Sequence, residues 1–166
     1  MSLTLIVPKK EDLTYRKQIV EDFKTMEYNH GIVPFPKEKW DGWYDKWIGN
    51  NDSNYFYAYL FDEDREEYVG EIAYRKDSES DGVILNIIIE YKHRGYGYGK
   101  EGLKELVKMA FKNGYTEVRD LIAGDNYGSQ KIFKNFGFNL AGYDSDGCAD
   151  FRMTKDEFIK RYGEID

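Results

Sequence analysis

Residues 93–103, HRGYGYGKEGL, alternate three glycines with two tyrosines inside a local cluster of basic side chains. The cluster consists of Lys92, His93, Arg94 and Lys100. The stretch follows a long apolar run and opens a segment with helical spacing. First-turn N–H groups of a helix have no intrahelical partner, and glycine lets an oxygen approach the backbone closely. The stretch therefore predicts a site for an anionic group in an otherwise acidic chain.

Known nucleotide-binding motifs account for these glycines less well. Gly97, Gly99 and Gly102 match the G-x-G-x-x-G dinucleotide fingerprint, and Asp120 lies near the spacing of its ribose ligand. That fingerprint opens a series of strand–helix units, and too few residues follow Gly102 to form one. A P-loop is excluded because Glu101 stands where Ser or Thr would hold magnesium. A tight turn without any ligand remains the simplest alternative.

Two motifs in order resemble those of the GNAT family of N-acetyltransferases. The first is Arg94-Gly95-Tyr96-Gly97-Tyr98-Gly99, which matches the family's Gln/Arg-x-x-Gly-x-Gly/Ala signature after a long strand. The second is Asn126-x-x-Ser129, followed by a short helix that ends in Gly137-Phe138. The order of the predicted elements also resembles the whole family fold.

The resemblance implies that the glycine stretch holds the pyrophosphate of acetyl-CoA. A bulge in the preceding strand, near Ile88 and Ile89, would leave backbone groups free for the pantetheine arm and the thioester oxygen. The cofactor-binding residues implied in this way are Ile88, Ile89, Arg94, Gly95, Tyr96, Gly97, Tyr98, Gly99, Lys100, Asn126, Ser129 and Phe133.

The implied reaction is direct transfer of an acetyl group from acetyl-CoA to a primary amine of a small molecule or a peptide. One alternative is a non-catalytic acyl-CoA-binding or sensor domain of the same fold. Another is an unrelated interaction module, in which the glycines form only a turn. Release of thiol in the presence of amines separates the first two, and absence of coenzyme A binding supports the third.

The catalytic groups are less clearly indicated than the cofactor site. Many relatives carry a tyrosine, thought to protonate the leaving thiolate, at the position that Phe133 occupies here. Tyr127 and Tyr143 have the chemistry to replace it. Glu71 and Glu90 are candidate general bases on predicted strands, although each is equally explained as a solvated carboxylate.

Aromatic residues form one stripe of a predicted helix at 37–48, with Trp40, Trp43, Tyr44 and Trp47 at helical spacing. Such a stripe usually packs in a core. Trp40, Trp43 and Tyr44 are also candidates for substrate binding, because in this family the first helices border the acceptor site and a cation is attracted to an aromatic face. His30, in a predicted loop, could reach the same cleft, whereas His93 would help bind phosphate.

The composition of the chain argues against several classes of function and site. The chain has 166 residues and a formal charge of -7, so we expect one domain, residues 1–166, that binds no nucleic acid. The single cysteine, Cys148, excludes an intrachain disulfide, and the two histidines give no sign of a metal site. No signal peptide or membrane span is predicted, which favours a cytoplasmic protein.

Hydrophobic periodicity predicts a mixed α/β (α+β) fold whose central, mostly antiparallel sheet is flanked by helices. The run at 83–91 is expected to be a central strand buried on both faces. The predicted edge strand at 138–143 could pair across a homodimer. Strands are predicted at 3–8, 54–61, 68–75, 83–91, 116–123, 138–143 and 148–154, and helices at 11–29, 37–48, 99–112, 126–136 and 156–162.

Overall fold

The computed structural model describes all residues, Met1–Asp166, and its seven strands form one mixed sheet. The strand order is β1-β2-β3-β4-β5-β7-β6, and only β4 and β5 are parallel. The predicted mixed, mostly antiparallel sheet with a strand–helix–strand crossover is therefore confirmed. The strands are β1 (Leu3–Ile6), β2 (Tyr55–Asp62), β3 (Glu67–Lys76), β4 (Gly82–Ile89), β5 (Glu117–Ile122), β6 (Asn139–Tyr143) and β7 (Ala149–Thr154).

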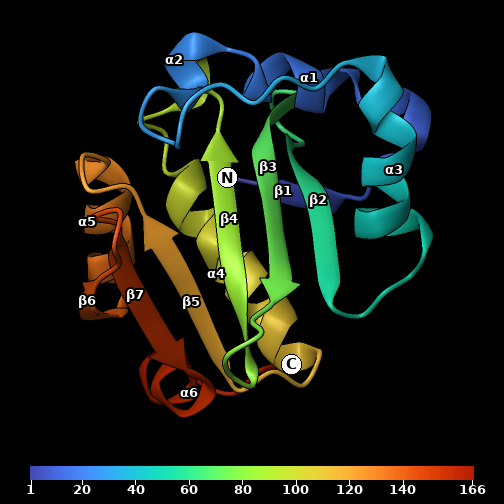
Figure 1. Ribbon diagram of the computed structural model, residues 1–166. Helices are drawn as coiled ribbons and strands as arrows, with labels where there is room; N and C mark the ends of the chain where they lie inside the picture. Colours follow the sequence, from blue (N-terminus) through green and yellow to red (C-terminus); the bar gives the residue numbers. More distant parts are fainter.

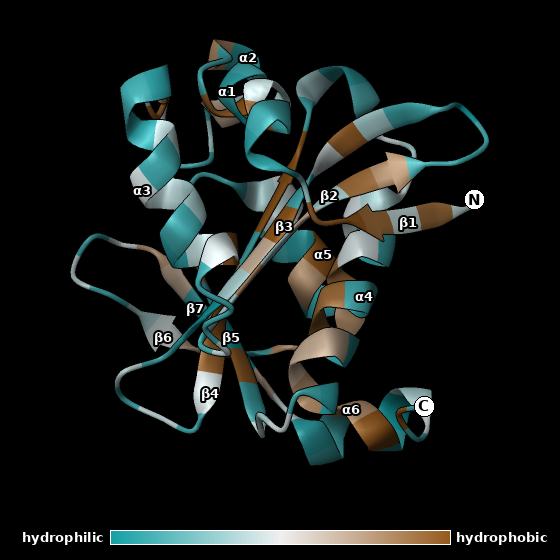
Figure 2. Cartoon of the chain, turned by 90° about the vertical axis from the view of Figure 1, so that its right-hand side faces the viewer, coloured by the Kyte–Doolittle hydropathy of each residue, from teal (hydrophilic) through white to brown (hydrophobic).

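Helices cover both faces of this sheet. The bounds are α1 (Thr14–Val20), α2 (Phe23–Met26), α3 (Trp40–Tyr44), α4 (Tyr98–Lys112), α5 (Tyr127–Phe136) and α6 (Lys155–Tyr162). In Figure 2, α4, α5 and α6 lie on one side of the sheet and α3 on the other, with apolar strands between them. The main core accordingly joins sheet residues to α4, α5 and α6, while smaller clusters lie under α1 and α3.

The prediction of one continuous helix at 11–29 is wrong. The segment consists of a 3-10 turn at Lys10–Asp12 followed by α1 and α2, with a break at Asp22. Asp22 has extended backbone angles, and its carboxylate accepts hydrogen bonds from the N–H (3.0 Å) and hydroxyl (2.6 Å) of Thr25. An aspartate in this position caps a new helix instead of continuing the old one, because its side chain satisfies the free N–H groups.

The aromatic stripe forms part of the hydrophobic core. The predicted helix at 37–48 is a 3-10 turn, then α3, then a π-helical turn at Asp45–Gly49. Trp40 is 8% exposed and stacks on Phe35, while Trp43 packs edge-to-face against Tyr57 of β2 at 4.7 Å. The stripe therefore fixes α3 against the sheet.

The strands β4 and β5 separate soon after they begin. They pair only from Gly82 to Ile84 on β4 and from Glu117 to Arg119 on β5, and then diverge, as Figure 1 shows. By contrast, β4 stays in continuous register with β3 up to Ile89, so the bulge expected in this strand is not present at that pairing. Divergence, not a bulge, frees the backbone of β4. The expectation that 83–91 is buried on both faces is also wrong, because Asn86 is exposed.

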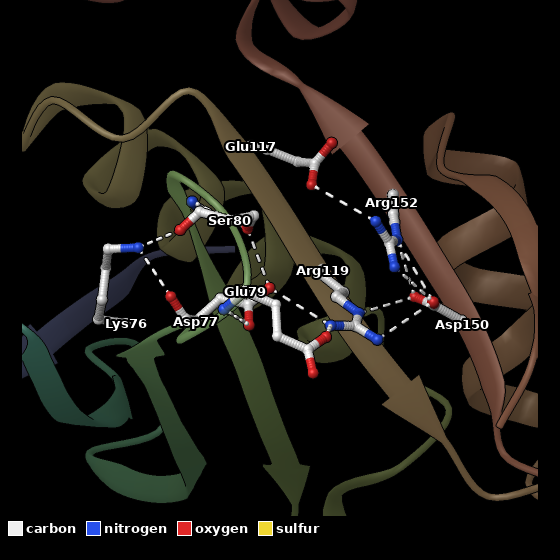
Figure 3. A network of polar contacts seen from close by, with 9 residues as sticks. Lys76, Asp77, Glu79, Ser80, Glu117, Arg119, Asp150 and Arg152 are labelled. Atoms are coloured by element: carbon white, nitrogen blue, oxygen red, sulfur yellow. Dashed lines mark hydrogen bonds and ion pairs between the residues drawn. The ribbon is translucent and has the colours of Figure 1, made fainter. Parts of the chain in front are cut away.

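An ionic network ties the closed end of this fork together (Figure 3). Arg119, the last residue of β5 that pairs with β4, contacts Asp77 of the β3–β4 turn at 3.3 Å and Asp150 of β7 at 3.0 Å. Arg152 of β7 contacts the same Asp150 at 2.9 Å. Because these groups come from three places in the chain, the network holds β5 in position where its pairing with β4 ends.

A second ion pair is buried on the opposite side of the molecule, beneath α1. Arg16 donates two hydrogen bonds to the carboxylate of Glu71, at 2.7 and 2.8 Å, and Tyr57 donates a third at 2.9 Å. The guanidinium also lies 4.5 Å from the ring of Trp43. Glu71 is 0% exposed, so the pair is stable only while both partners are present.

We predict that Glu71→Ala destabilises the fold strongly, because it leaves the Arg16 guanidinium buried without its counter-charge. The expected loss in the free energy of unfolding is about 3–5 kcal/mol, measured by urea denaturation. Glu79→Ala is the matched control, since the Glu79 side chain is 79% exposed and only approaches Arg119 at 3.9 Å. Its expected effect is below about 1 kcal/mol. Equal losses in the two variants would contradict the buried pair.

Candidate active site

The glycine stretch forms the N-terminus of α4. Gly97 is the N-cap residue, with a left-handed φ of 87°, and no side chain caps the helix. Its first N–H groups are therefore free of any capping side chain, as an anion site requires. Gly102 lies within the helix, where a Cβ would approach Leu60 Cδ1 to 2.9 Å. Its role is close packing of the helix on the sheet.

The loop before α4 is held from both sides. The hydroxyl of buried Tyr98 donates to Asp62 at the β2–β3 turn, and Arg65 contacts the same hydroxyl at 3.3 Å. On the other side, Arg94 donates to the carbonyls of Thr25 (2.6 Å) and Ile89 (3.1 Å). The free N–H groups are thus presented by a fixed backbone.

A groove of about 760 Å³ runs from this loop into the fork between β4 and β5. It is lined on one side by Asn86, Ile87 and Ile89, and on the other by Asp120 and the residues that follow it. The carbonyl of Ile89 accepts from Arg94, whereas the N–H of Glu90 bonds to β3 at Val69. Backbone groups alternate in direction along a strand, so those of Ile87 and Ile89 point into the groove.

Most residues expected to bind the cofactor meet in this groove. Those that line it are Ile89, Arg94, Gly95, Gly97, Tyr98, Gly99, Lys100, Asn126, Ser129 and Phe133. Two expected residues do not line it. Ile88 is 4% exposed and packs with the α1 cluster, and Tyr96 is 55% exposed beside Arg65.

The far side of the groove is formed by the start of α5. Asn126 caps this helix, because its side-chain oxygen accepts from the N–H of Ser129 at 3.2 Å. Its amide nitrogen donates to Asn29, just after α2, at 3.2 Å. This bond joins the β5 side of the opening to the β4 side. Phe133 is 4% exposed and packs against Phe138, so no hydroxyl is present at that place.

A second cavity, of about 880 Å³, adjoins the groove. Both are lined by His30, Asn86, Asp120, Leu121, Ala123 and Asp125. The shared residues make one continuous path from the glycine stretch to the second cavity. The aromatic residues that line the second cavity include Trp47, and not the expected Trp40, Trp43 or Tyr44. His30 lies in both cavities, as its expected position in a loop near the cleft requires.

The two glutamates singled out in the sequence line neither cavity. Glu71 has both oxygens engaged by Arg16 and one also by Tyr57. Glu90 is 8% exposed and accepts a hydrogen bond from Tyr15 at 3.0 Å. This contact with Glu90, after burial of the hydroxyl, raises the pKa of Tyr15. Both carboxylates therefore stabilise the contact between α1 and the sheet.

Asp120 occupies the position at the junction of the two cavities. It directly follows Arg119, the last residue of β5 that pairs with β4. Its side chain is half-buried, and no side chain donates to its carboxylate. Withdrawal from water raises its pKa to about 8, although a hydrogen bond from the backbone N–H of Leu121 acts in the opposite direction. A carboxylate in this range can accept a proton near neutral pH. The sequence EVRDLI of this strand already contains three charged residues, so Asp120 did not stand out, and the sequence did not show that this strand borders an opening.

Most of the chain matches a known domain family. A model of the acetyltransferase (GNAT) domain family matches residues 2–139, which span β1 to the start of β6. The chain belongs to the GNAT family. Among proteins of curated function, no sequence matches this GNAT domain.

Solved structures show the same fold at low sequence identity. This GNAT domain is similar to the spermidine N-acetyltransferase of Vibrio cholerae in complex with CoA and spermine, with a TM-score of 0.80 and 15% identity over 95% of this chain and 98% of that one. A phosphinothricin acetyltransferase from Sinorhizobium meliloti in complex with AcCoA gives 0.72 and 20% over 93% and 89%. An N-acetyltransferase from Staphylococcus aureus Mu50 gives 0.74 and 18% over 93% and 99%.

The structure contains no helix with the length and apolar character that crossing a membrane requires. No three His, Cys, Asp or Glu side chains are grouped in a way that could hold a metal ion.

We predict that Asp120 titrates with a pKa near 8, compared with its ordinary value of 3.8, because burial disfavours the carboxylate. Carboxyl-carbon NMR, assigned with Asp120→Asn, measures this directly. Between these two pKa values the native state binds more protons than the unfolded state. The stability of the wild type should therefore fall relative to Asp120→Asn as pH rises from 4 to 8. A titration below pH 5 would contradict the burial of this group.

Proposed function

We propose that this GNAT domain is an acetyl-CoA-dependent N-acetyltransferase that transfers an acetyl group to a primary amine of a small molecule or a peptide. The observation that carries the proposal is the continuous path between two cavities. One begins at the anion-binding end of α4, and both meet at Asp120. Such a path lets a cofactor and an acceptor enter separately and meet at one titratable group.

The groove fits the cofactor of this family. The glycine-rich start of α4 has no capping side chain and lies beside Lys100, so it suits the pyrophosphate of acetyl-CoA. The free backbone groups of Ile87 and Ile89 suit the amides of its pantetheine arm. When bound, acetyl-CoA supplies the acetyl group as a reactive thioester. The N–H groups of Ile87 and Ile89, which face the groove, would orient its carbonyl.

Asp120 is the proposed general base. In its ionised form it accepts the proton that an ammonium must lose before it becomes a nucleophile. Its raised pKa gives the carboxylate a useful affinity for this proton. Asn86, on the facing strand, lines both cavities and contributes a polar group at the same place. Burial of Glu71 and Glu90 behind the sheet leaves them less suited to this role.

A second candidate function is a non-catalytic acyl-CoA-binding or sensor domain. It is favoured by Phe133, which has no proton to donate and is packed in the core. A thiol with a pKa of about 8.5 is nevertheless a tolerable leaving group without an acid. Activity therefore does not require a tyrosine at this position.

We predict that Lys100→Glu weakens acetyl-CoA binding by about 10-fold, because it places a like charge beside the phosphate groups at the start of α4. Calorimetric titration of acetyl-CoA measures the effect. Lys112→Glu is the control, since Lys112 ends the same helix away from the groove. Lack of binding by the wild type would overturn the proposed function, and equal effects of the two variants would place the cofactor elsewhere.

We also predict that Asp120→Asn lowers kcat by about 10²–10⁴-fold, the usual contribution of a general base. The binding of acetyl-CoA should stay close to that of the wild type. In the wild type, kcat/KM should rise with pH through about 8, where Asp120 loses its proton, and the variant should lack this limb. The measurement is thiol release over a range of amine concentrations at each pH, with acetyl-CoA saturating. An unchanged pH profile in Asp120→Asn would exclude this residue as the base.

A further inference from the structure

The second cavity is strongly acidic. Its charged residues are Asp120, Asp125, Asp144 and Asp146, with Arg75 as the one fixed cation. The aspartates come from β5, the loop that follows it and the β6–β7 turn. Three separate segments of the chain thus direct carboxylates to one space, which gives it a net negative charge.

These carboxylates have no cationic partners in the protein. None of the four belongs to an ion pair, although the structure forms such pairs elsewhere, as at Arg119 and Arg152. Asp144 accepts hydrogen bonds from the N–H groups of Asp146 (2.9 Å) and Cys148 (2.8 Å), which shapes the turn but does not neutralise it. A cation bound in the cavity would therefore meet uncompensated charge.

Two further observations indicate a cationic ligand. Asp120 is withdrawn from bulk water at the boundary with the cofactor groove and has no side-chain partner, so it can pair with a group that enters the cavity. Trp47 stacks on Trp43, at 6.1 Å between ring centroids, and lines the same space. An indole ring attracts ammonium groups, whereas it offers little to a carboxylate.

Building on the N-acetyltransferase function proposed above, we propose that the acceptor is a diamine or polyamine. One nitrogen reacts beside Asp120, and a second cationic nitrogen is held by Asp125 and Asp146. An acceptor that carries a carboxylate is disfavoured, because like charges in one interface cost several kcal/mol. The spermidine and phosphinothricin enzymes both share the fold at 20% identity or less, so the fold does not identify the acceptor and the charge of this chain's own cavity carries the argument.

The test compares three acceptors that each contain four carbons: 1,4-diaminobutane, butylamine and 4-aminobutanoate. They differ only in the group at the far end, which is cationic, neutral or anionic. With acetyl-CoA saturating, thiol release should give a kcat/KM for the diamine about 10-fold above butylamine and about 100-fold above 4-aminobutanoate, since each factor of ten corresponds to 1.4 kcal/mol. Equal values for the diamine and butylamine would overturn the inference.

Two variants test where the second cationic nitrogen of the diamine binds. Asp125→Asn and Asp146→Asn should each raise the KM for the diamine about 5–10-fold more than the KM for butylamine, the range of a single charge contact. Asp81→Asn, an exposed aspartate in the β3–β4 turn, is the matched control. Asp144 is unsuitable as a test because it also shapes the turn. An unchanged diamine KM in both variants would contradict the assignment.

Calorimetry separates this inference from the proposed function. If acetyl-CoA does not bind the wild type, the acetyltransferase proposal fails. If acetyl-CoA binds but no amine reacts, 1,4-diaminobutane is titrated into the protein saturated with CoA. Binding that is weakened in Asp125→Asn and Asp146→Asn supports a diamine site, and absence of binding overturns it.

Discussion

The site depends on the early end of the pairing between β4 and β5. Two parallel strands that stayed paired would satisfy each other's backbone groups and leave no space between them. Here the ladder stops after Ile84 and Arg119. Beyond it, Asn86, Ile87 and Ile89 on β4 and residues 120–122 on β5 line a groove. The salt-bridge network at Arg119 holds β5 where the pairing ends. The rest of the sheet is continuous, so a rigid frame surrounds one opening.

The two ends of the opening carry different chemical groups. At its wide end, the start of α4 offers backbone N–H groups without a capping side chain. At its closed end, the strands contribute Asn86 and Asp120, and the second cavity begins. The strand β4 begins at the closed end of the fork and ends at the glycine stretch. The direction of this strand therefore sets the order of negative and positive regions along the path.

The sequence predicted much of this arrangement, and the limits have physical causes. Strong periodicity and the positions of the glycines were sufficient to predict the seven strands, α4 and the glycine loop that precedes it. The break at Asp22 was missed because helical spacing continues across it, while the capping bond to Thr25 depends on local geometry. Glu71 was misleading because burial and pairing with Arg16, 55 residues away along the chain, are tertiary properties. The importance of Asp120 likewise depends on the divergence of two strands, which no local pattern encodes.

The hydrogen bond between Asn29 and Asn126 has a mechanical consequence. Beyond Ile84, no backbone ladder fixes the distance between the two arms of the fork, and this side-chain contact acts as a cross-brace over its open end. The arm on the β4 side is itself fastened to α2 through Thr25 and Arg94. The opening is therefore bridged at one place where no backbone pairing spans it. A ligand held beneath this contact would leave at a rate that depends on how often the contact opens, as well as on the strength of its own contacts.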